Sequence, residues 1–346
     1  MRERIYRPIV ELTIARLLEF VREPEAVFWT VIFPLVLAFA LGIAFRNKSD
    51  APVYAGVLEG TGSAEISAAL GRSAGIAPRV LGEDQAARAL RDGEVEVIVV
   101  PGTPPAYRFD PARPESQRAR LAVDEALQRA AGREDKFVAR QQPLQVVGGR
   151  YIDWLVPGLL GMNIMGTGMW SIGFAVVWAR TKKVLKRFAA TPMRRRDYLL
   201  AQLLARLVFL TGEVAALLGF AVLVFAVPIR GSILTVAVVS VLGALAFGGL
   251  GLLVASRART IEAVSGWMNF AMLPMWVVSG VFFSSSHFPA PMQPFIQALP
   301  LTALNNAFRA VMLDGASLAG IGGEVAILGG WTVVCFATAL KIFRWK

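Results

Sequence analysis

Two long apolar runs lie close together in the second half of the chain: LLARLVFLTGEVAALLGFAVLVFAV, residues 203–227, and ILTVAVVSVLGALAFGGLGLLVA, residues 233–255. Each is longer than the roughly 20 residues that a helix needs to cross the hydrocarbon core of a bilayer. Five residues separate the two runs, and Arg230 is the only charged residue among them. The two runs therefore predict consecutive membrane-spanning helices.

Four further apolar runs complete the predicted membrane domain: 26–45, 152–179, 264–283 and 321–343. The chain is 55% hydrophobic and only 18% charged, and this balance excludes an ordinary soluble enzyme. We predict an α-helical integral membrane protein with six transmembrane helices. Ala38-Phe39-Ala40 resembles a signal-peptide cleavage site, but 25 mixed-charge residues precede the first run, which favours a retained span.

Residues 46–150 contain no comparable apolar run and predict a small α/β domain between spans 1 and 2. The expected elements are strands at 53–58, 95–100 and 107–109 and helices at 64–72, 85–91 and 115–131. Alternation of strands and helices favours a partly parallel sheet. This insert has no histidine or cysteine and no phosphate-binding loop, so we find no catalytic constellation in it.

The distribution of charge predicts the orientation of the chain in the membrane. The segment from Arg180 to Arg206, both ends included, has nine lysines and arginines but only one acid, Asp197. The positive-inside rule places this loop and both termini in the cytoplasm and the 46–150 domain outside. The net charge of +11 is then mostly a signal of topology, and nucleic-acid binding is disfavoured.

Residues 1–25 predict a cytoplasmic amphipathic helix at the membrane interface. Its apolar residues recur at roughly helical spacing: Ile5, Ile9, Leu12, Leu17 and Val21. The helix is either a simple anchor or a platform for a cytoplasmic partner.

A second cytoplasmic segment is the loop at 180–203. Val184, Leu185 and Phe188 form an apolar stripe on a basic helix, which Pro192 ends. Such a helix binds anionic headgroups or docks a cytoplasmic protein, and the residues alone leave both interpretations open.

One ionisable residue, Glu213, lies well inside the third span. An ionisable group in the bilayer normally faces protein or water. Glu213 is therefore either a pathway or proton-linked residue, or a protonated or hydrogen-bonded residue that packs against a threonine, a serine or Asn163 and holds helices together. Trp170, on the second span, is a further candidate for the pathway or for helix packing. Ser240, Ala244 and Gly248 form a ridge of small residues that favours close helix packing.

Residues 263–308 contain no charged residue, and this stretch is too long for one span. We predict a span followed by a re-entrant helical hairpin at 284–315 on the outer face, covered by protein or water. His287 is more consistent with an interfacial residue than with a ligand.

The motifs of several enzyme classes are absent from the sequence. No lysine follows a glycine, which excludes a phosphate-binding loop of the GxxxxGK type. The chain has one histidine and one cysteine, too few for a zinc site built on these residues. We therefore predict a protein that conducts, transports or transmits force rather than an enzyme.

Three segments stand in a characteristic order: YIDWLVPG at 151–158, RTKKVLKRFAATP at 180–192 followed by YLL at 198–200, and LPLTAL at 299–304 followed by FRA at 308–310 and Gly315. They resemble the second-span opening, cytoplasmic loop and last-span signature of type-2 permeases of ABC exporters. The insert resembles that of the subgroup with an extracytoplasmic α/β domain.

The resemblance implies a dimer of permeases in the bacterial inner membrane, each bound to a separate ATPase subunit that holds ATP and Mg²⁺. The chain itself would bind no cofactor. The resemblance places ATPase coupling at Lys183, Val184, Leu185, Arg187, Phe188, Pro192 and Arg195, together with the N-terminal helix. It places an outer gate at Phe283, Leu304, Phe308 and Arg309. Membrane lipids and a periplasmic adaptor are further candidate partners.

The predicted function is ATP-driven export of a hydrophobic or amphipathic substrate, such as a drug, a lipid or a glycan-lipid. The alternative is a mechanical transmitter or envelope-assembly scaffold that acts through its extracytoplasmic domain.

Overall fold

The computed structural model describes residues 8–45, 52–134, 137, 148–181, 195–258 and 260–342. The chain divides into two compact units. The membrane unit combines Met1–Asn47 with Gln145–Lys346, and the inserted unit is Lys48–Leu144.

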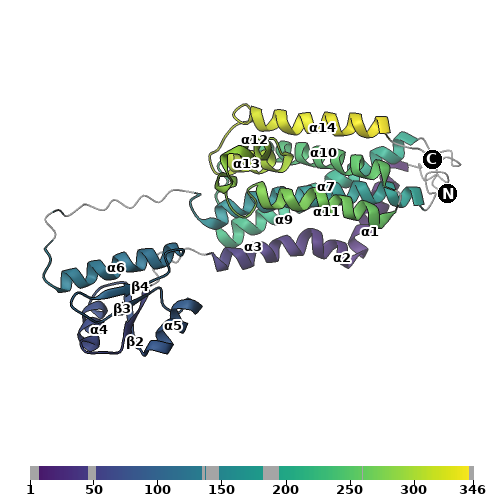
Figure 1. Cartoon of the computed structure of the whole chain (residues 1–346). Coiled ribbons are helices and arrows are strands. Elements are labelled where there is room, and N and C mark those ends of the chain that lie inside the picture. The colour runs from purple at the N-terminus through teal and green to yellow at the C-terminus, as the bar shows by residue number, and fades with distance from the viewer. Residues whose placement is uncertain are drawn as a thin grey trace. The chain divides into compact units, whose positions relative to one another are not determined.

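The described part of the membrane unit is helical, as predicted (Figure 1). Its helices are α1 (Pro8–Arg22), α2 (Pro24–Val27), η1 (Phe28–Ile32), α3 (Phe33–Ala44), α7 (Tyr151–Thr181), α9 (Arg195–Phe225), α10 (Ile233–Arg257), α11 (Ile261–Val278), η2 (Ser285–His287), η3 (Ala290–Met292), α12 (Gln293–Gln297), α13 (Pro300–Met312) and α14 (Gly322–Ile342). We call the end where α3 finishes and α7 begins the insert end, because the inserted unit is connected there.

Five helices of the described residues are long and apolar enough to cross a membrane: Pro24–Ala44, Tyr151–Trp178, Leu204–Phe225, Ile233–Arg257 and Gly322–Ile342. Helix α11 covers most of the remaining predicted span, but it is 18 residues long and includes Glu262, Asn269 and Pro274. The helical membrane architecture is confirmed, and the number of six spans stays a prediction.

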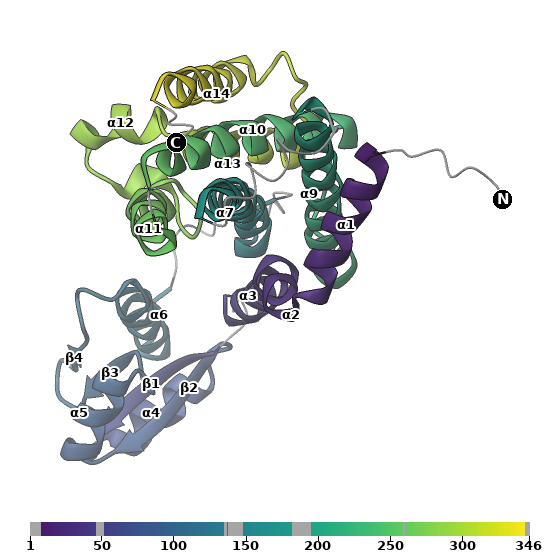
Figure 2. The same ribbon diagram turned by 90° about the vertical axis from the view of Figure 1, so that its right-hand side faces the viewer.

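Helix α7 is the centre of the membrane unit. It contacts α3, α9, α10, α11 and α13, and Figure 2 shows it enclosed by its neighbours. Glycines allow the close approach of α10. A Cβ atom on Gly251 would lie 2.6 Å from the backbone oxygen of Met169, and one on Gly248 would lie 2.6 Å from Ile172 Cδ1. Gly248, in the predicted ridge of small residues, thus packs within the chain.

The inserted unit is a four-stranded sheet in the order β2-β1-β3-β4. Its strands are β1 (Val53–Leu58), β2 (Ile76–Leu81), β3 (Val97–Val100) and β4 (Ala106–Arg108), and its helices are α4 (Ser63–Gly71), α5 (Glu83–Asp92) and α6 (Pro114–Ala130). β1 pairs in parallel with β2 and β3, and β4 is antiparallel to β3. The prediction of a partly parallel sheet is confirmed.

Strand β2 was not predicted from the sequence, because Pro78 interrupts its apolar residues. A proline fits an edge strand when its nitrogen faces away from the sheet. The carbonyl groups of Gly75 and Leu81 accept hydrogen bonds from the backbone of Val53, at the start of β1, and of Glu59, directly after it. Pro78 lies three residues from both Gly75 and Leu81, so its nitrogen is on the free edge.

Both faces of this sheet carry a buried core. On one face, Ala55, Val57, Val97 and Val99 pack with residues of α4 and α6. On the other face, Ile98 packs with Ala86 and Ala89 of α5. The inserted unit therefore has a hydrophobic core of its own.

Candidate functional site in the membrane unit

A buried ion pair on α9 lies where this helix contacts α7. Arg206 Nη1 and Glu213 Oε1 are 3.1 Å apart, and the two side chains are only 12% and 4% exposed. Arg206 Nη2 donates to Thr167 Oγ1 at 2.8 Å, and Thr167 Oγ1 lies 3.0 Å from Glu213 Oε2. The three side chains form one network that joins the two helices.

The sequence separation of this pair explains its geometry. Arg206 and Glu213 are seven residues apart on α9, which puts them two turns apart on the same helix face. The long arginine side chain spans this distance and neutralises the buried carboxylate, as an ionisable group within a membrane domain requires. Glu213 was recognised from the sequence and a threonine or serine was expected beside it, but Thr167 could not be named, because nothing local indicates which α7 residue α9 meets. Arg206 was missed, although its seven-residue spacing from Glu213 on one helix was a local signal.

Asn163 and Trp170, the other two candidates for the pathway or for helix packing, lie on α7. The backbone oxygen of Asn163, rather than its side-chain amide, accepts a hydrogen bond from Thr167 Oγ1 at 2.9 Å. Trp170 stacks on Phe174 with ring centroids 4.7 Å apart. Asn163 therefore adjoins the Glu213 network, and Trp170 belongs to an aromatic pair two turns after Asn163 on the same helix.

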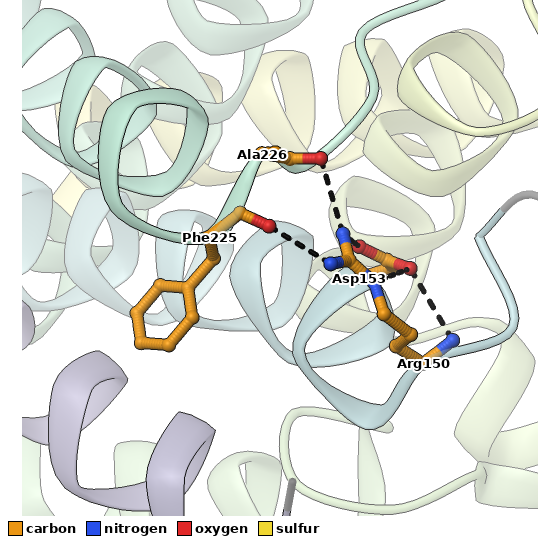
Figure 3. A network of polar contacts seen from close by, with 4 residues as sticks. All are labelled: Arg150, Asp153, Phe225 and Ala226. Carbon is orange, nitrogen blue, oxygen red and sulfur yellow. Dashed lines mark hydrogen bonds and ion pairs between the residues drawn. The ribbon is translucent and has the colours of Figure 1, made fainter. Parts of the chain in front are cut away.

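A second network ties the start of α7 to the end of α9 (Figure 3). Asp153, only 1% exposed, accepts hydrogen bonds from Arg150 Nε at 3.0 Å and Nη2 at 2.7 Å. The guanidinium group also donates to the carbonyl oxygens of Phe225 at 2.9 Å and Ala226 at 3.1 Å. A cation at the carbonyl end of a helix is favourable. The bonds to Asp153 raise the pKa of Arg150 above its ordinary value.

Tyr151 makes two contacts beside this network. The centroids of the Tyr151 and Phe45 rings are 4.6 Å apart. Its hydroxyl group donates to the carbonyl oxygen of Phe282 at 3.0 Å. Because Phe45 follows α3 and Tyr151 begins α7, the two flanks of the inserted unit meet in this aromatic pair.

The turn after α11 is held by buried polar residues of α13. Asn305 Nδ2 donates to the Ser279 oxygen at 2.9 Å, and Arg309 Nη2 donates to the Gly280 oxygen. The Arg309 guanidinium also lies 3.5 Å from the centroid of the Trp154 ring, a cation–π contact. Opposite the turn, a Cβ atom on Gly158 would lie 2.5 Å from the Val281 oxygen, so α7 fits closely against it.

The structure brings together only part of the predicted outer gate. Leu304 and Phe308 are fully buried on α13 beside Arg309. Leu304 packs against α10, where its methyl groups lie 2.8 Å from the position of a Cβ atom on Gly243. Phe283 is instead 44% exposed and contacts Phe288, with ring centroids 6.0 Å apart.

Arg180, at the end of α7, binds the carbonyl end of α10. Its Nη1 donates to the Ala258 oxygen at 2.7 Å and the Ala255 oxygen at 3.3 Å. This side chain had no role predicted from the sequence, although a basic residue at a helix end is a usual carbonyl partner.

The predicted coupling residues Lys183, Val184, Leu185, Arg187, Phe188 and Pro192 lie outside the described residues. Arg195 is the first residue of α9. Among the described residues, no group of three or more histidine, cysteine, aspartate or glutamate side chains is placed to hold a metal ion.

A family model described as "ABC-2 type transporter" matches residues 124–313, which is more than half of the chain. The chain belongs to the ABC-2 type transporter family. It is therefore a multi-pass transmembrane permease subunit of an ABC transporter, and its partner is an ABC ATPase. The matched range begins in α6 and ends just after α13, so it includes every network described above.

Several characterised or named proteins are similar to this ABC-2 family member. The probable multidrug ABC transporter permease YbhS of Escherichia coli K12 is 25% identical over 350 residues, which cover 90% of this chain and 89% of that protein. Nodulation protein J of Bradyrhizobium diazoefficiens is 28% identical over 58% of this chain and 76% of its own. ABC transporter G family member 20 of Dictyostelium discoideum is 28% identical over 49% of this chain and 23% of its own.

Proposed function

We propose that this permease exports a hydrophobic or amphipathic substrate, such as a drug, a lipid or a glycan-lipid, with ATP and Mg²⁺ bound by the separate ATPase. The observation that carries this proposal is the similarity to a probable multidrug permease over 90% of this chain. That alignment is long enough to include the inserted unit as well as the membrane unit.

We propose six crossings, with both termini in the cytoplasm of a bacterial cell and the inserted unit outside the inner membrane. The contacts at the two ends of α11 support this number. Arg180, at the end of α7, binds Ala258 just before α11, whereas Tyr151, at the start of α7, binds Phe282 just after it. Helix α11 thus runs between the same two ends of the bundle as α7.

We propose that ATPase coupling uses the loop at 180–203, with Arg195 among its residues, and α1. Helix α1 packs on α9, where the rings of Phe20 and Phe209 are 4.4 Å apart. Because α9 begins at Arg195, within the 180–203 loop, a displacement of either coupling element would reach the same membrane helix. A second copy of the permease is the proposed dimer partner.

Transport is tested in inside-out vesicles that contain this chain and the ABC ATPase that co-purifies with it. A fluorescent amphipathic dye is the probe. We expect ATP-dependent dye accumulation that stops when the ATPase carries an inactivating substitution in its phosphate-binding loop. Vesicles with an active ATPase but no accumulation of any dye, lipid or glycan-lipid probe would contradict export.

The alternative function is force transmission through the inserted unit. The hydrophobic core of that unit supports this alternative, because a separately folded unit can act as a working part. Removing residues 50–142 distinguishes the two. A conduit retains part of its transport without the unit. A transmitter loses its whole activity, while the remaining chain still binds the ATPase.

A further inference from the structure

Both covalent connections between the inserted unit and the membrane unit reach the bundle at one place. The first leaves from Phe45, after α3, and the second returns at Arg150 and Tyr151, at the start of α7. The rings of Phe45 and Tyr151 are in contact, with centroids 4.6 Å apart. We call Phe45, Arg150 and Tyr151 the junction. Any force between the two units that travels along the chain passes through these residues.

The junction is bonded to two other elements at the insert end. Arg150 holds the carbonyl groups of Phe225 and Ala226 at the end of α9 (Figure 3). The hydroxyl group of Tyr151 holds the carbonyl group of Phe282. These bonds connect the flanks of the insert to the helix that carries the Glu213 network and to the turn that precedes α12 and α13.

Where the turn at 279–283 comes closest to α7, the α7 residue is a glycine without a side chain. The turn lies against Gly158, and it is held from the other side by Asn305 and Arg309 of α13. A shift of Tyr151 therefore acts on the turn directly, through one hydrogen bond, and α13 follows through two more.

We propose that Phe45, Arg150 and Tyr151 are positioning residues through which the inserted unit controls how readily the insert end of the bundle opens at residues 279–283. The inserted unit then acts as a regulator of the outer opening. The inference deepens the proposed transport function, but its test needs neither substrate nor ATP, so the two can fail separately.

The test measures exposure of the turn in the full-length chain with a Val281→Cys probe, at a position that is fully buried in the turn, and a membrane-impermeant maleimide. The parent chain gives the background, since Cys335 is fully buried. Tyr151→Phe removes the bond to Phe282 and keeps the ring against Phe45. We expect labelling to become about fivefold faster, the ratio that loss of one ordinary hydrogen bond produces. Tyr54→Phe, the same change on the inserted unit, is the matched control and leaves the rate unchanged.

A second modification lengthens both connections between the junction and the inserted unit. Five-residue Gly/Ser linkers are inserted between Asn47 and Lys48 and between Leu144 and Gln145. If the junction relays the state of the unit, the linkers also accelerate labelling, and combining them with Tyr151→Phe adds little to the faster single change. Rate increases that multiply would overturn the proposal. So would a Tyr151→Phe chain that labels at the same rate as the probe chain with Tyr151 intact. If Tyr151→Phe does not fold, Phe45→Leu is combined with the linkers in the same way.

Discussion

The ion pair between Arg206 and Glu213 places two charges at an otherwise apolar helix contact. Glu213→Gln keeps the shape of the side chain but leaves the arginine buried without a carboxylate. Breaking one side of a buried pair costs about 3–5 kcal/mol. We expect a clear drop in the thermal midpoint of the detergent-solubilised protein, measured by fluorescence-detected size-exclusion chromatography.

Two further variants test the cause of that drop. Glu262→Gln changes an exposed glutamate and is expected to leave the midpoint unchanged. Arg206→Met combined with Glu213→Met removes both charges, and it should recover most of the lost stability because no unpaired charge remains. A double variant less stable than Glu213→Gln would show that the pair itself, rather than its neutrality, is required.

Tyr107 gives the inserted unit a predictable response to alkaline pH. Burial, followed by the hydrogen bond to Asp124 at 3.0 Å, raises its pKa to about 12. An unfolded tyrosine ionises near pH 10, so the folded state holds this proton more tightly. Stability is therefore lost as the pH rises from about 10 towards 12. In denaturant titrations of the isolated unit, Tyr107→Phe should weaken this loss, and equal pH dependence in the two forms would contradict the assignment.

Sequence patterns were sufficient for most elements but not for their partners. Apolar runs predicted α7, α9, α10 and α14, because lipid demands long uninterrupted helices. Strand β2 was missed because its tolerance of Pro78 depends on which edge of the sheet it occupies. Glu213 was recognised from its cost in the membrane, but Thr167 lies 46 positions away. Which α7 residue pairs with Glu213 depends on how α7 and α9 pack, and the residues near Glu213 in the sequence do not indicate this.

At the scale of elements, glycines on α7 and α9 have opposite environments. A Cβ atom on Gly158 would meet the backbone of Val281 at 2.5 Å, whereas nothing lies within 4 Å of one on Gly212. Gly158→Ala must push the 279–283 turn away from α7, and overpacking of this kind costs about 1–3 kcal/mol. We expect it to lower the thermal midpoint.

Gly212→Ala is the matched control on α9. It creates no clash and replaces glycine by a better helix former, so its midpoint should equal or exceed that of the parent. If Gly158→Ala were as stable as Gly212→Ala, the close contact between α7 and the turn would be wrong.

At the scale of the whole molecule, the inserted unit should fold without the membrane unit. Residues 52–134 carry a complete sheet with cores on both faces. We expect this fragment to be soluble and to unfold cooperatively in urea, monitored by circular dichroism. Val57→Asp, which places a charge at a fully buried position, should abolish the transition. A parent fragment without a cooperative transition would mean that the unit depends on the rest of the chain.

The pairing of Arg206 with Glu213 also has an electrical consequence. Moving one elementary charge through a membrane potential changes its energy by about 2.3 kcal/mol per 100 mV. The two side chains together carry no net charge, so α9 can shift across the field with the pair intact and perform almost no electrical work. The pair itself would then add almost nothing to the dependence of the transport rate on the membrane potential.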